Sequence, residues 1–233
     1  MFTDKDIEQM RNKGISLDQV NTQIDRLKNG MTHSNLVSAA TIGRGIQSFD
    51  KEEFEDLVAF YNSKQNDLDI LKFVPASGAA TRMFKFLFQF LKNFNPSKDT
   101  IKKYAEKQGV DLIKTFVSNL NKFPFYNQVM EAIKESTPNY NSLKQEEQYY
   151  EFVQTMLNQE GLNYSFFPKG LLPFHEYKEF VATAFREHLF ESTLYASSKS
   201  NSNLHFTVSE QHHNYFLEEF KAIKPSLEAK ENT

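Results

Sequence analysis

Residues 69–83 have the sequence Asp-Ile-Leu-Lys-Phe-Val-Pro-Ala-Ser-Gly-Ala-Ala-Thr-Arg-Met. The run up to Val74 contains β-branched and aromatic side chains and ends at Pro75, which predicts a short strand. Small residues continue to Thr81, and from Met83 the chain is apolar at nearly every position, which predicts a loop and then a core helix. A strand that leads into a helix in this way is typical of an α/β fold.

The loop in this stretch has the properties of a phosphate-binding turn. Its backbone amides and the positive end of the helix dipole would face a ligand above the loop, and phosphate suits that environment. Gly78 allows close approach, Thr81 offers a hydroxyl, and the guanidinium of Arg82 can make two hydrogen bonds to phosphoryl oxygens. Tight packing of a helix on a strand would select the same small residues, so the residues alone leave both interpretations open.

Most of the remaining chain has helical patterns. Thr3 and Ser16 predict the starts of two short helices, and a third is predicted from Asp50. Ser142 predicts the start of a longer helix, which Gly161 ends. These signals lie on both sides of the predicted strand and loop, so the protein should be helix-rich.

A second strand is predicted at Leu204–Val208, where apolar and polar residues alternate, after a turn at Asn201–Asn203. Helical spacing predicts one helix that includes Tyr177 to Leu189 and another from Ser209 to Ile223. We therefore expect an α/β fold in four parts: a helical N-terminal segment (1–66), a partial α/β core with few parallel strands (67–97 and 162–225), a helical insertion (98–161) and a flexible tail (226–233).

Composition excludes several classes of function. Basic and acidic residues nearly balance at a net charge of -3, so no long-range field would hold the chain on nucleic acid or on an anionic membrane. The chain has no cysteine, which excludes disulfides and thiolate chemistry. No apolar stretch is long enough to span a bilayer. We therefore expect a cytoplasmic protein with neither a nucleic-acid nor a membrane partner.

Two motifs resemble the signature of nucleotide-sugar pyrophosphorylases. Residues 77–83, Ser-Gly-Ala-Ala-Thr-Arg-Met, are similar to their Gly-Gly-x-Gly-Thr-Arg-Met loop, and residues 168–173, Pro-Lys-Gly-Leu-Leu-Pro, are similar to the Pro-Lys-x-Leu-Leu-Pro segment that completes it. The resemblance implies an incomplete Rossmann-like nucleotide-diphospho-sugar transferase core. It also implies that the insertion folds away and returns Lys169 to the loop, and that the ligand is a nucleotide or a sugar nucleotide.

The same resemblance implies roles for individual residues. Arg82 and Lys169 would act in catalysis by neutralising the transferring nucleotidyl phosphate and its pyrophosphate leaving group. The residues that would bind the nucleotide phosphates are Ala76, Ser77, Gly78, Ala79, Ala80 and Thr81. Nucleotidyl transfer in that family requires Mg²⁺, whose carboxylate ligands lie on later strands. We therefore expect a nucleotide- or sugar-nucleotide-binding domain that is either the N-terminal part of a longer protein, active as a nucleotidyltransferase in full length, or a reduced form that has lost its chemistry. The alternative is a mainly helical binding or structural module without catalytic activity.

A more extensive resemblance involves residues 73–85 and Ala39–Ile46. Both segments resemble an uncharacterised bacterial family known as domain of unknown function 4301. This likeness spans most of the chain and implies no particular activity.

Three further patterns have a functional and a structural interpretation. His205, Glu210, His212 and His213 could bind zinc, but adjacent histidines point in different directions on a helix, and the alternative is a solvated helix start. His175 could touch a ligand or begin a helix. The aromatic residues at 83–94 and 149–152 could stack on bases, although core packing is the more common use of aromatics at helical spacing.

Overall fold

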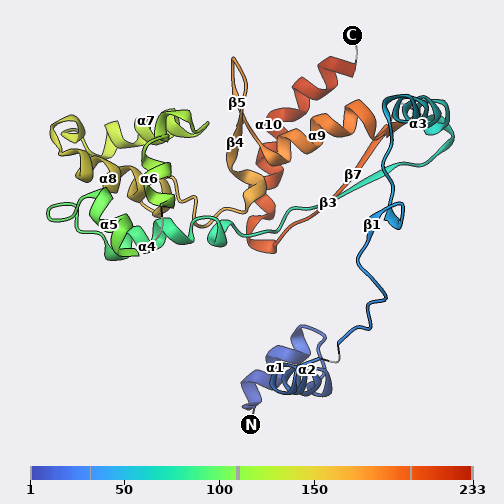
Figure 1. Cartoon of the computed structure of the whole chain (residues 1–233), viewed down its shortest axis with the longest axis horizontal. Coiled ribbons are helices and arrows are strands. Elements are labelled where there is room, and N and C mark those ends of the chain that lie inside the picture. The colour runs from blue at the N-terminus through green and yellow to red at the C-terminus, as the bar shows by residue number, and fades with distance from the viewer. Residues whose placement is uncertain (1, 32, 109–110, 200, 232–233) are drawn as a thin grey trace. The chain divides into compact units, whose positions relative to one another are not determined.

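The computed structural model describes residues 2–31, 33–108, 111–199 and 201–231 (Figure 1). The chain divides into two compact units, residues 1–57 and 58–233, and the boundary in the sequence falls within the third helix. In chain order the α-helices, 3₁₀ turns (η) and strands are α1 (Asp4–Asn12), α2 (Leu17–Asn29), β1 (Thr41–Ile42), β2 (Gly45–Ile46), α3 (Lys51–Lys64), η1 (Gln65–Asp67), β3 (Leu71–Pro75), η2 (Ala80–Arg82), α4 (Lys85–Asn93), α5 (Ile101–Gln108), α6 (Leu112–Val117), η3 (Leu120–Lys122), α7 (Tyr126–Ser136), η4 (Tyr140–Ser142), α8 (Gln145–Leu157), η5 (Lys169–Leu171), β4 (Pro173–Glu176), β5 (Val181–Thr183), α9 (Ala184–Tyr195), β6 (Ser197–Ser198), β7 (Asn201–Thr207), η6 (Glu210–His212) and α10 (His213–Glu231). The fold is α/β and helix-rich, as predicted.

The first unit confirms the helix starts expected at its amino end. The hydroxyls of Thr3 and Ser16 accept hydrogen bonds from the third amide of α1 and α2, and the side chains of Asp6 and Gln19 accept in return from the two cap amides. Gly30 ends α2 with a φ of 78°, a conformation that glycine adopts without steric cost. Local capping chemistry therefore fixes these helices.

The second unit contains an α/β part that is built on the parallel pairing of β3 with β7. Leu71 to Pro75 align with Asn203 to Thr207, and β6 pairs antiparallel with β7, so the strand order is β3-β7-β6. Both predicted strands are thus confirmed, and they are direct neighbours. A small core forms where α9 and α10 pack together; its buried members are Ala76, Phe185, Leu189, Phe216 and Ile223.

A separate core lies among the helices between the two main strands. Helices α4 to α8 surround it, and its fully buried side chains include Leu87, Phe90, Val129, Ile133, Phe152, Val153, Met156 and Leu157. The aromatic residues of 83–94 and 149–152 contribute to this core, as the packing interpretation expected. The predicted helical region 98–161 therefore has an interior of its own.

Three local predictions were wrong. The helix that ends at Leu157 starts at Gln145, and its first turn is capped by Glu147, which accepts from the amide of Lys144, whereas Ser142 bonds back to Asn139. Residues 201–203 are the start of β7 and not a turn, because Ser198 and Asn201 pair across a tight reversal at Lys199, which has a φ of 51°.

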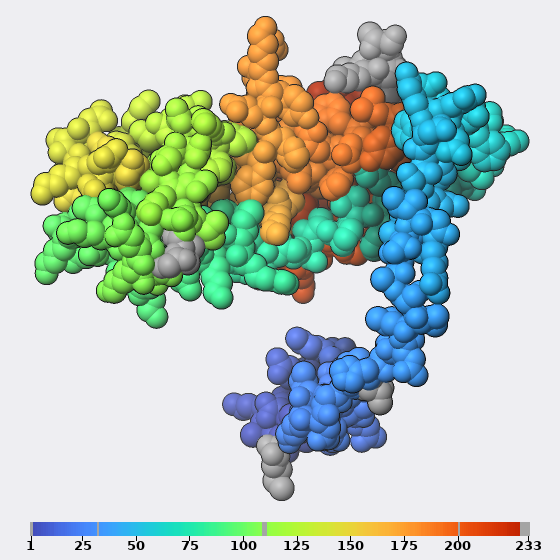
Figure 2. All heavy atoms as spheres, viewed as in Figure 1, coloured from blue at the N-terminus to red at the C-terminus, as the bar shows by residue number. Residues whose placement is uncertain are grey.

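The third error concerns the segment before α9. A hairpin of β4 and β5 stands in place of the first half of the predicted helix, and it projects from the surface in Figure 2. Tyr177 and Phe180 stack at its tip with 4.8 Å between ring centroids, so the helical spacing of these apolar residues reflected a hairpin contact. The helix begins only at Ala184, because the Thr183 hydroxyl accepts from the amide of Arg186 and caps it there.

Residues 226–231 are helical, in contrast to the flexible tail predicted for 226–233; residues 232–233 lie outside the described part. Helix α10 continues through Pro225, although an internal proline removes one backbone hydrogen bond and costs about 3 kcal/mol. Ile223 and Leu227, on either side of the proline, both pack against the small core. Tertiary contact therefore outweighs the local cost.

The turn after α8 requires glycine, and we predict that Gly161→Ala destabilises the protein. A Cβ atom on Gly161 would lie 2.0 Å from the carbonyl oxygen of Thr155, so the backbone must move. We expect the free energy of unfolding to fall by about 1–3 kcal/mol, the usual range for overpacking. Gly78→Ala is the matched control, because a Cβ there has no neighbour within 4 Å. Equal unfolding midpoints for the two variants in urea would contradict the assignment.

A pH-dependent ion pair joins β3 to α9. Lys72 Nζ donates to the Glu191 carboxylate at 2.5 Å, and the Tyr195 hydroxyl and His188 Nδ1 also lie within 3.1 Å of Glu191 Oε2. The hydrogen bond from Lys72 lowers the pKa of Glu191 from 4.5 to about 2. Because the folded pKa is lowered, the stabilisation is complete above pH 4.5 and is lost as the pH falls towards 2.

We therefore predict that the stability difference between the wild type and Glu191→Gln is pH-dependent. Denaturant unfolding should show the largest difference near neutral pH and a shrinking one below pH 4.5. Glu179→Gln, at an exposed carboxylate, should match the wild type at every pH. A Glu191→Gln deficit that stays constant down to pH 2 would refute the role of the charge.

Candidate functional site

The loop from Ala76 to Arg82 follows the carboxyl end of β3. Ala76 is buried and its amide donates to the carbonyl of Thr207 at 2.9 Å, while Ala80 is completely buried at the start of η2. These two small residues pack, as the structural interpretation of the loop requires. The five residues that remain, Ser77, Gly78, Ala79, Thr81 and Arg82, are exposed.

The exposed part of the loop holds several unsatisfied donors. Among the residues that the structure describes, the backbone N–H groups of Ser77, Gly78 and Ala79 have no acceptor. Within the same part of the chain, the guanidinium of Arg82 has neither a hydrogen bond nor an ion pair. Consecutive free amides, followed three residues later in the chain by a free guanidinium, are groups that can hold an oxyanion.

The segment that carries Lys169 lies directly against this loop. The amide of Lys169 donates to the carbonyl of Gly78 at 3.0 Å, and Pro168 forms an isolated antiparallel bridge with Ala79. Gly170 also lies near the loop, since a Cβ atom added to it would be 3.7 Å from the carbonyl oxygen of Ala76. The intervening helices thus return Lys169 to the loop, and its exposed ammonium group has no ion-pair partner among the described residues.

The substitutions of glycine in the loop cause no backbone strain. Ser77 and Ala80 stand where the pyrophosphorylase motif has glycine, yet the described non-glycine residues with positive φ are Asn163 and Lys199. Gly78 does not have a positive φ either, and the space beside its Cα is open. Gly78 is therefore not required for the backbone conformation of the loop, and the space beside its Cα is open to a ligand.

Two cavities are lined by residues close in sequence to Lys169 and to Arg82. One, of about 450 Å³, has walls that include Phe167 and Leu171, each two residues from Lys169 in the chain, together with Tyr215 and Glu218. The other, of about 540 Å³, is almost entirely apolar and starts at Met83, one residue after Arg82. The first offers hydroxyl and carboxylate groups beside aromatic rings, and the second offers an apolar surface.

His212 is a structural residue and not a metal ligand or part of a solvated helix start. It is buried, its Nε2 lies 2.9 Å from the carbonyl oxygen of Phe166, and its Nδ1 lies 2.6 Å from the Ser209 hydroxyl. A carbonyl can only accept, so Nε2 donates to Phe166. The ring thus ties the start of α10 to the loop that carries Lys169.

The remaining histidines do not assemble into a metal site. His205 stacks on Phe73 with 5.1 Å between ring centroids, and His213 is exposed. Residues 2–31, 33–108, 111–199 and 201–231 contain no group of three or more histidine and acidic side chains that could hold a metal ion. His175 lies exposed on β4 and not at a helix start.

Sequence reasoning missed the cluster around Lys72. Burial alone would lower the pKa of this lysine, but its hydrogen bonds to Glu191 and Tyr195 outweigh burial and raise it. The sequence does carry a local signal, since Lys72 interrupts an otherwise apolar strand. A charge on the inner face of a strand requires a partner, although only the fold identifies Glu191 as that partner.

We predict that His212→Phe destabilises the protein. Phenylalanine fills a similar volume but leaves the carbonyl of Phe166 and the hydroxyl of Ser209 without a partner, at a cost of about 1–3 kcal/mol. His213→Phe alters the exposed neighbour and should leave the thermal midpoint unchanged. The role of His212 would be refuted by equal midpoints in calorimetry.

Comparison with known proteins defines the family of the chain but not its activity. No curated protein matches the chain, and no solved structure matches it either. No helix in the described part of the chain has the length and apolar character needed to cross a membrane. The family model described as "Domain of unknown function (DUF4301)" matches residues 3–233, so the chain belongs to this family.

Proposed function

We propose that this protein binds a nucleotide or a sugar nucleotide, with its phosphates on the exposed part of the loop 76–82 and between Arg82 and Lys169. The observation that carries the proposal is the backbone contact between Gly78 and Lys169. This contact joins two segments that are distant in the sequence, and each contributes a cation without a protein partner among the described residues.

The position of the loop in the sheet supports a ligand site. The carboxyl ends of β3 and β7 meet at one edge, where Pro75 aligns with Thr207. Ligands of open α/β sheets bind outside the carboxyl ends of parallel strands, and the Rossmann-like arrangement proposed here obeys that rule. The loop after β3 and Ser209 after β7 both start at this edge.

The electrostatics suit the phosphates of such a ligand. Three successive amides provide directed donors, Arg82 can form a bidentate contact, and Lys169 contributes a second positive charge. The cavity lined by Phe167 and Leu171 has a volume of about 450 Å³, within the usual range for a small-ligand pocket, and we assign the base or the sugar to it. Its Glu218 and Glu219 can accept hydrogen bonds from sugar hydroxyls.

Catalysis is a separate matter from binding. Magnesium in nucleotidyltransferases is held by carboxylates together with substrate phosphates, and the described residues contain no cluster of acidic and histidine side chains that could hold a metal. We therefore assign binding to this chain and derive no Mg²⁺-dependent step.

A second candidate function, a binding or structural module without catalytic activity, has one observation in its favour. Ala76 and Ala80 are buried, so part of the small-residue pattern already serves the packing of the loop on the sheet. This explanation does not extend to Ser77, Gly78 and Ala79, which are exposed. The two functions differ in whether those three residues contact a ligand.

We predict that nucleotides stabilise the protein against heat and that Arg82→Ala removes most of this effect. At a ligand concentration about 100-fold above Kd, stabilisation should reach about 2.7 kcal/mol. Loss of a charged hydrogen-bond donor should weaken nucleotide binding about tenfold or more. The affinity of Arg82→Lys should lie between those of the wild type and Arg82→Ala, because lysine keeps the charge but cannot form the bidentate contact of a guanidinium. The stabilisation of each variant is measured as the shift of its thermal midpoint in the presence of ribonucleoside triphosphates or UDP-glucose.

Two further variants make the test specific. Gly78→Val fills the open space above the loop and should abolish the nucleotide shift while the midpoint of the free protein stays unchanged. Lys103→Ala removes an exposed cation from α5 and should bind like the wild type. The proposal fails if no nucleotide in the panel shifts the midpoint, or if Lys103→Ala loses as much binding as Arg82→Ala.

A further inference from the structure

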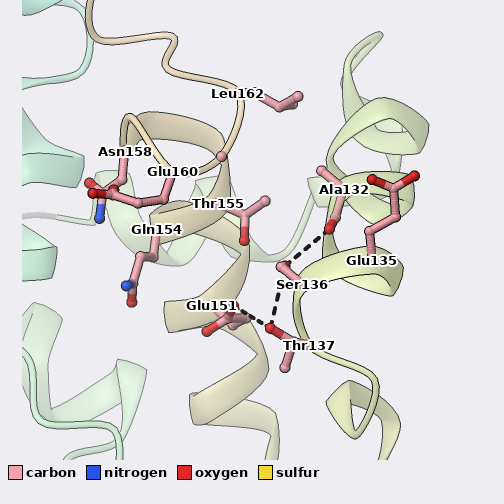
Figure 3. Close-up of a pocket in the computed structure, with 11 residues that line it drawn as sticks. Ala132, Glu135, Ser136, Thr137, Glu151, Gln154, Thr155, Asn158, Glu160 and Leu162 are labelled. Carbon is pink, nitrogen blue, oxygen red and sulfur yellow. Dashed lines mark hydrogen bonds between the residues drawn. The ribbon is translucent and has the colours of Figure 1, made fainter.

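Two large cavities in the helical part of the second unit have opposite character. One, of about 610 Å³, lies between α7 and α8 and is polar; in its wall the Thr137 hydroxyl donates to Glu151 at 2.7 Å (Figure 3). Its other carboxylates, those of Glu135 and Glu160, belong to exposed residues that water can satisfy. The second cavity, of about 540 Å³, is almost entirely apolar, and apolar surface in contact with water costs about 25 cal/mol for each Å². Burial by a ligand would therefore stabilise the second cavity.

The apolar cavity has walls from four separate parts of the chain. They come from the start of α4, from α6, from the segment around η3 and from β4. Among the described residues, the polar members of the lining are Thr115 and Asn119, and the side-chain amide of Asn119 already donates to the carbonyl of Thr115 at 2.7 Å. The cavity thus offers few hydrogen bonds to the body of a ligand, which selects a hydrocarbon.

A continuous row of aromatic rings runs along the cavity. Phe116 contacts Phe86 and Phe123, with 5.9 and 5.0 Å between ring centroids, and the row continues from Phe123 through Phe125 to Phe174. Successive ring planes meet at 75°, 30°, 9° and 63°. A rigid planar ligand cannot stack on rings that turn in this way, whereas a flexible chain can follow them. The shape of the wall therefore favours an aliphatic chain.

The charged residues next to the cavity are mostly basic. Of the residues that directly precede or follow a member of the lining, one is acidic, Asp111, and it is paired with Lys114 at 2.9 Å. The other charged residues in these positions, Arg82, Lys85 and Lys122, are exposed and have no ion pair within the described part of the chain. Unpaired cations beside an apolar cavity complement an anionic head group.

We propose that this cavity binds a free fatty acid, with the aliphatic chain along the ring row and the carboxylate in the field of Arg82, Lys85 and Lys122. The bound chain would also cover apolar surface of the lining that now faces water, such as Leu112, which is 57% exposed. The proposal does not depend on nucleotide binding, because no residue of the loop 76–82 belongs to the lining.

Titration of the full chain with cis-parinaric acid tests the proposal, because the fluorescence of this fatty acid rises in an apolar environment. The wild type should bind it saturably, and palmitate should displace it. 1-Hexadecanol has the same chain length as palmitate but no charge, so it should compete about tenfold less well. This difference should shrink as NaCl is added, because salt screens the attraction between the carboxylate and the cations.

Matched variants locate the site. Leu112→Asp places a negative charge in the lining and should weaken binding about tenfold or more. The fold should tolerate this change, since Leu112 is exposed and begins α6, where an acidic side chain suits the helix dipole. Leu194→Asp makes the same change at an exposed leucine of α9 outside the cavity and should bind like the wild type. If Leu112→Asp fails to fold, Thr115→Trp fills the cavity from an exposed position instead.

Several outcomes overturn the proposal. It fails if cis-parinaric acid shows no saturable binding, if hexadecanol competes as well as palmitate, or if Leu112→Asp and Leu194→Asp lose equal affinity. It also fails if the cavity has a different occupant. A second copy of the chain would appear in sedimentation as a dimer that Leu112→Asp dissociates, and a lipid bilayer would appear as binding to phosphatidylglycerol vesicles that the same variant loses.

Discussion

The parallel pairing of β3 with β7 is the contact on which the rest of the second unit depends. It aligns Leu71–Pro75 with Asn203–Thr207, so the chain between the two strands must fold and return within one closed loop. Such a long closure costs entropy that a short ladder does not recover alone. The helical core and the packing of α9 and α10 supply the remaining stabilisation, and the ladder in turn fixes where the loop after β3 begins.

What the sequence could predict depended on how local the stabilising contacts are. The caps at Thr3 and Ser16, the strand before Pro75 and the helical region 98–161 follow from neighbouring residues, and the structure confirms them. The hairpin of β4 and β5 could not be predicted, because a helix and a hairpin both explain the apolar spacing there and only the Thr183 cap separates them. The partner of Lys72 could not be predicted from the sequence either, since Glu191 becomes its neighbour only in the fold.

The candidate site was predictable in composition but not in detail. The motif resemblance placed Lys169 beside the loop, and the structure brings the two backbones together through Gly78 and Pro168. The pattern of apolar residues could not show that some small residues of the loop pack against the sheet while others are exposed. Ala76 and Ala80 are buried, whereas Ser77, Gly78 and Ala79 are exposed and their amides have no acceptor among the described residues.

The way the loop is held keeps its charges available. Two hydrogen bonds to backbone carbonyls fix these segments: the amide of Lys169 donates to Gly78, and the ring of His212 donates to Phe166. An ion pair of this sheet lies elsewhere, between Lys72, the second residue of β3, and Glu191 of α9. Had carboxylates anchored the loop, they would have neutralised Arg82 and Lys169 and excluded an anionic ligand. Because neither of these contacts uses a carboxylate, Arg82 and Lys169 keep their charges without an ion-pair partner among the described residues.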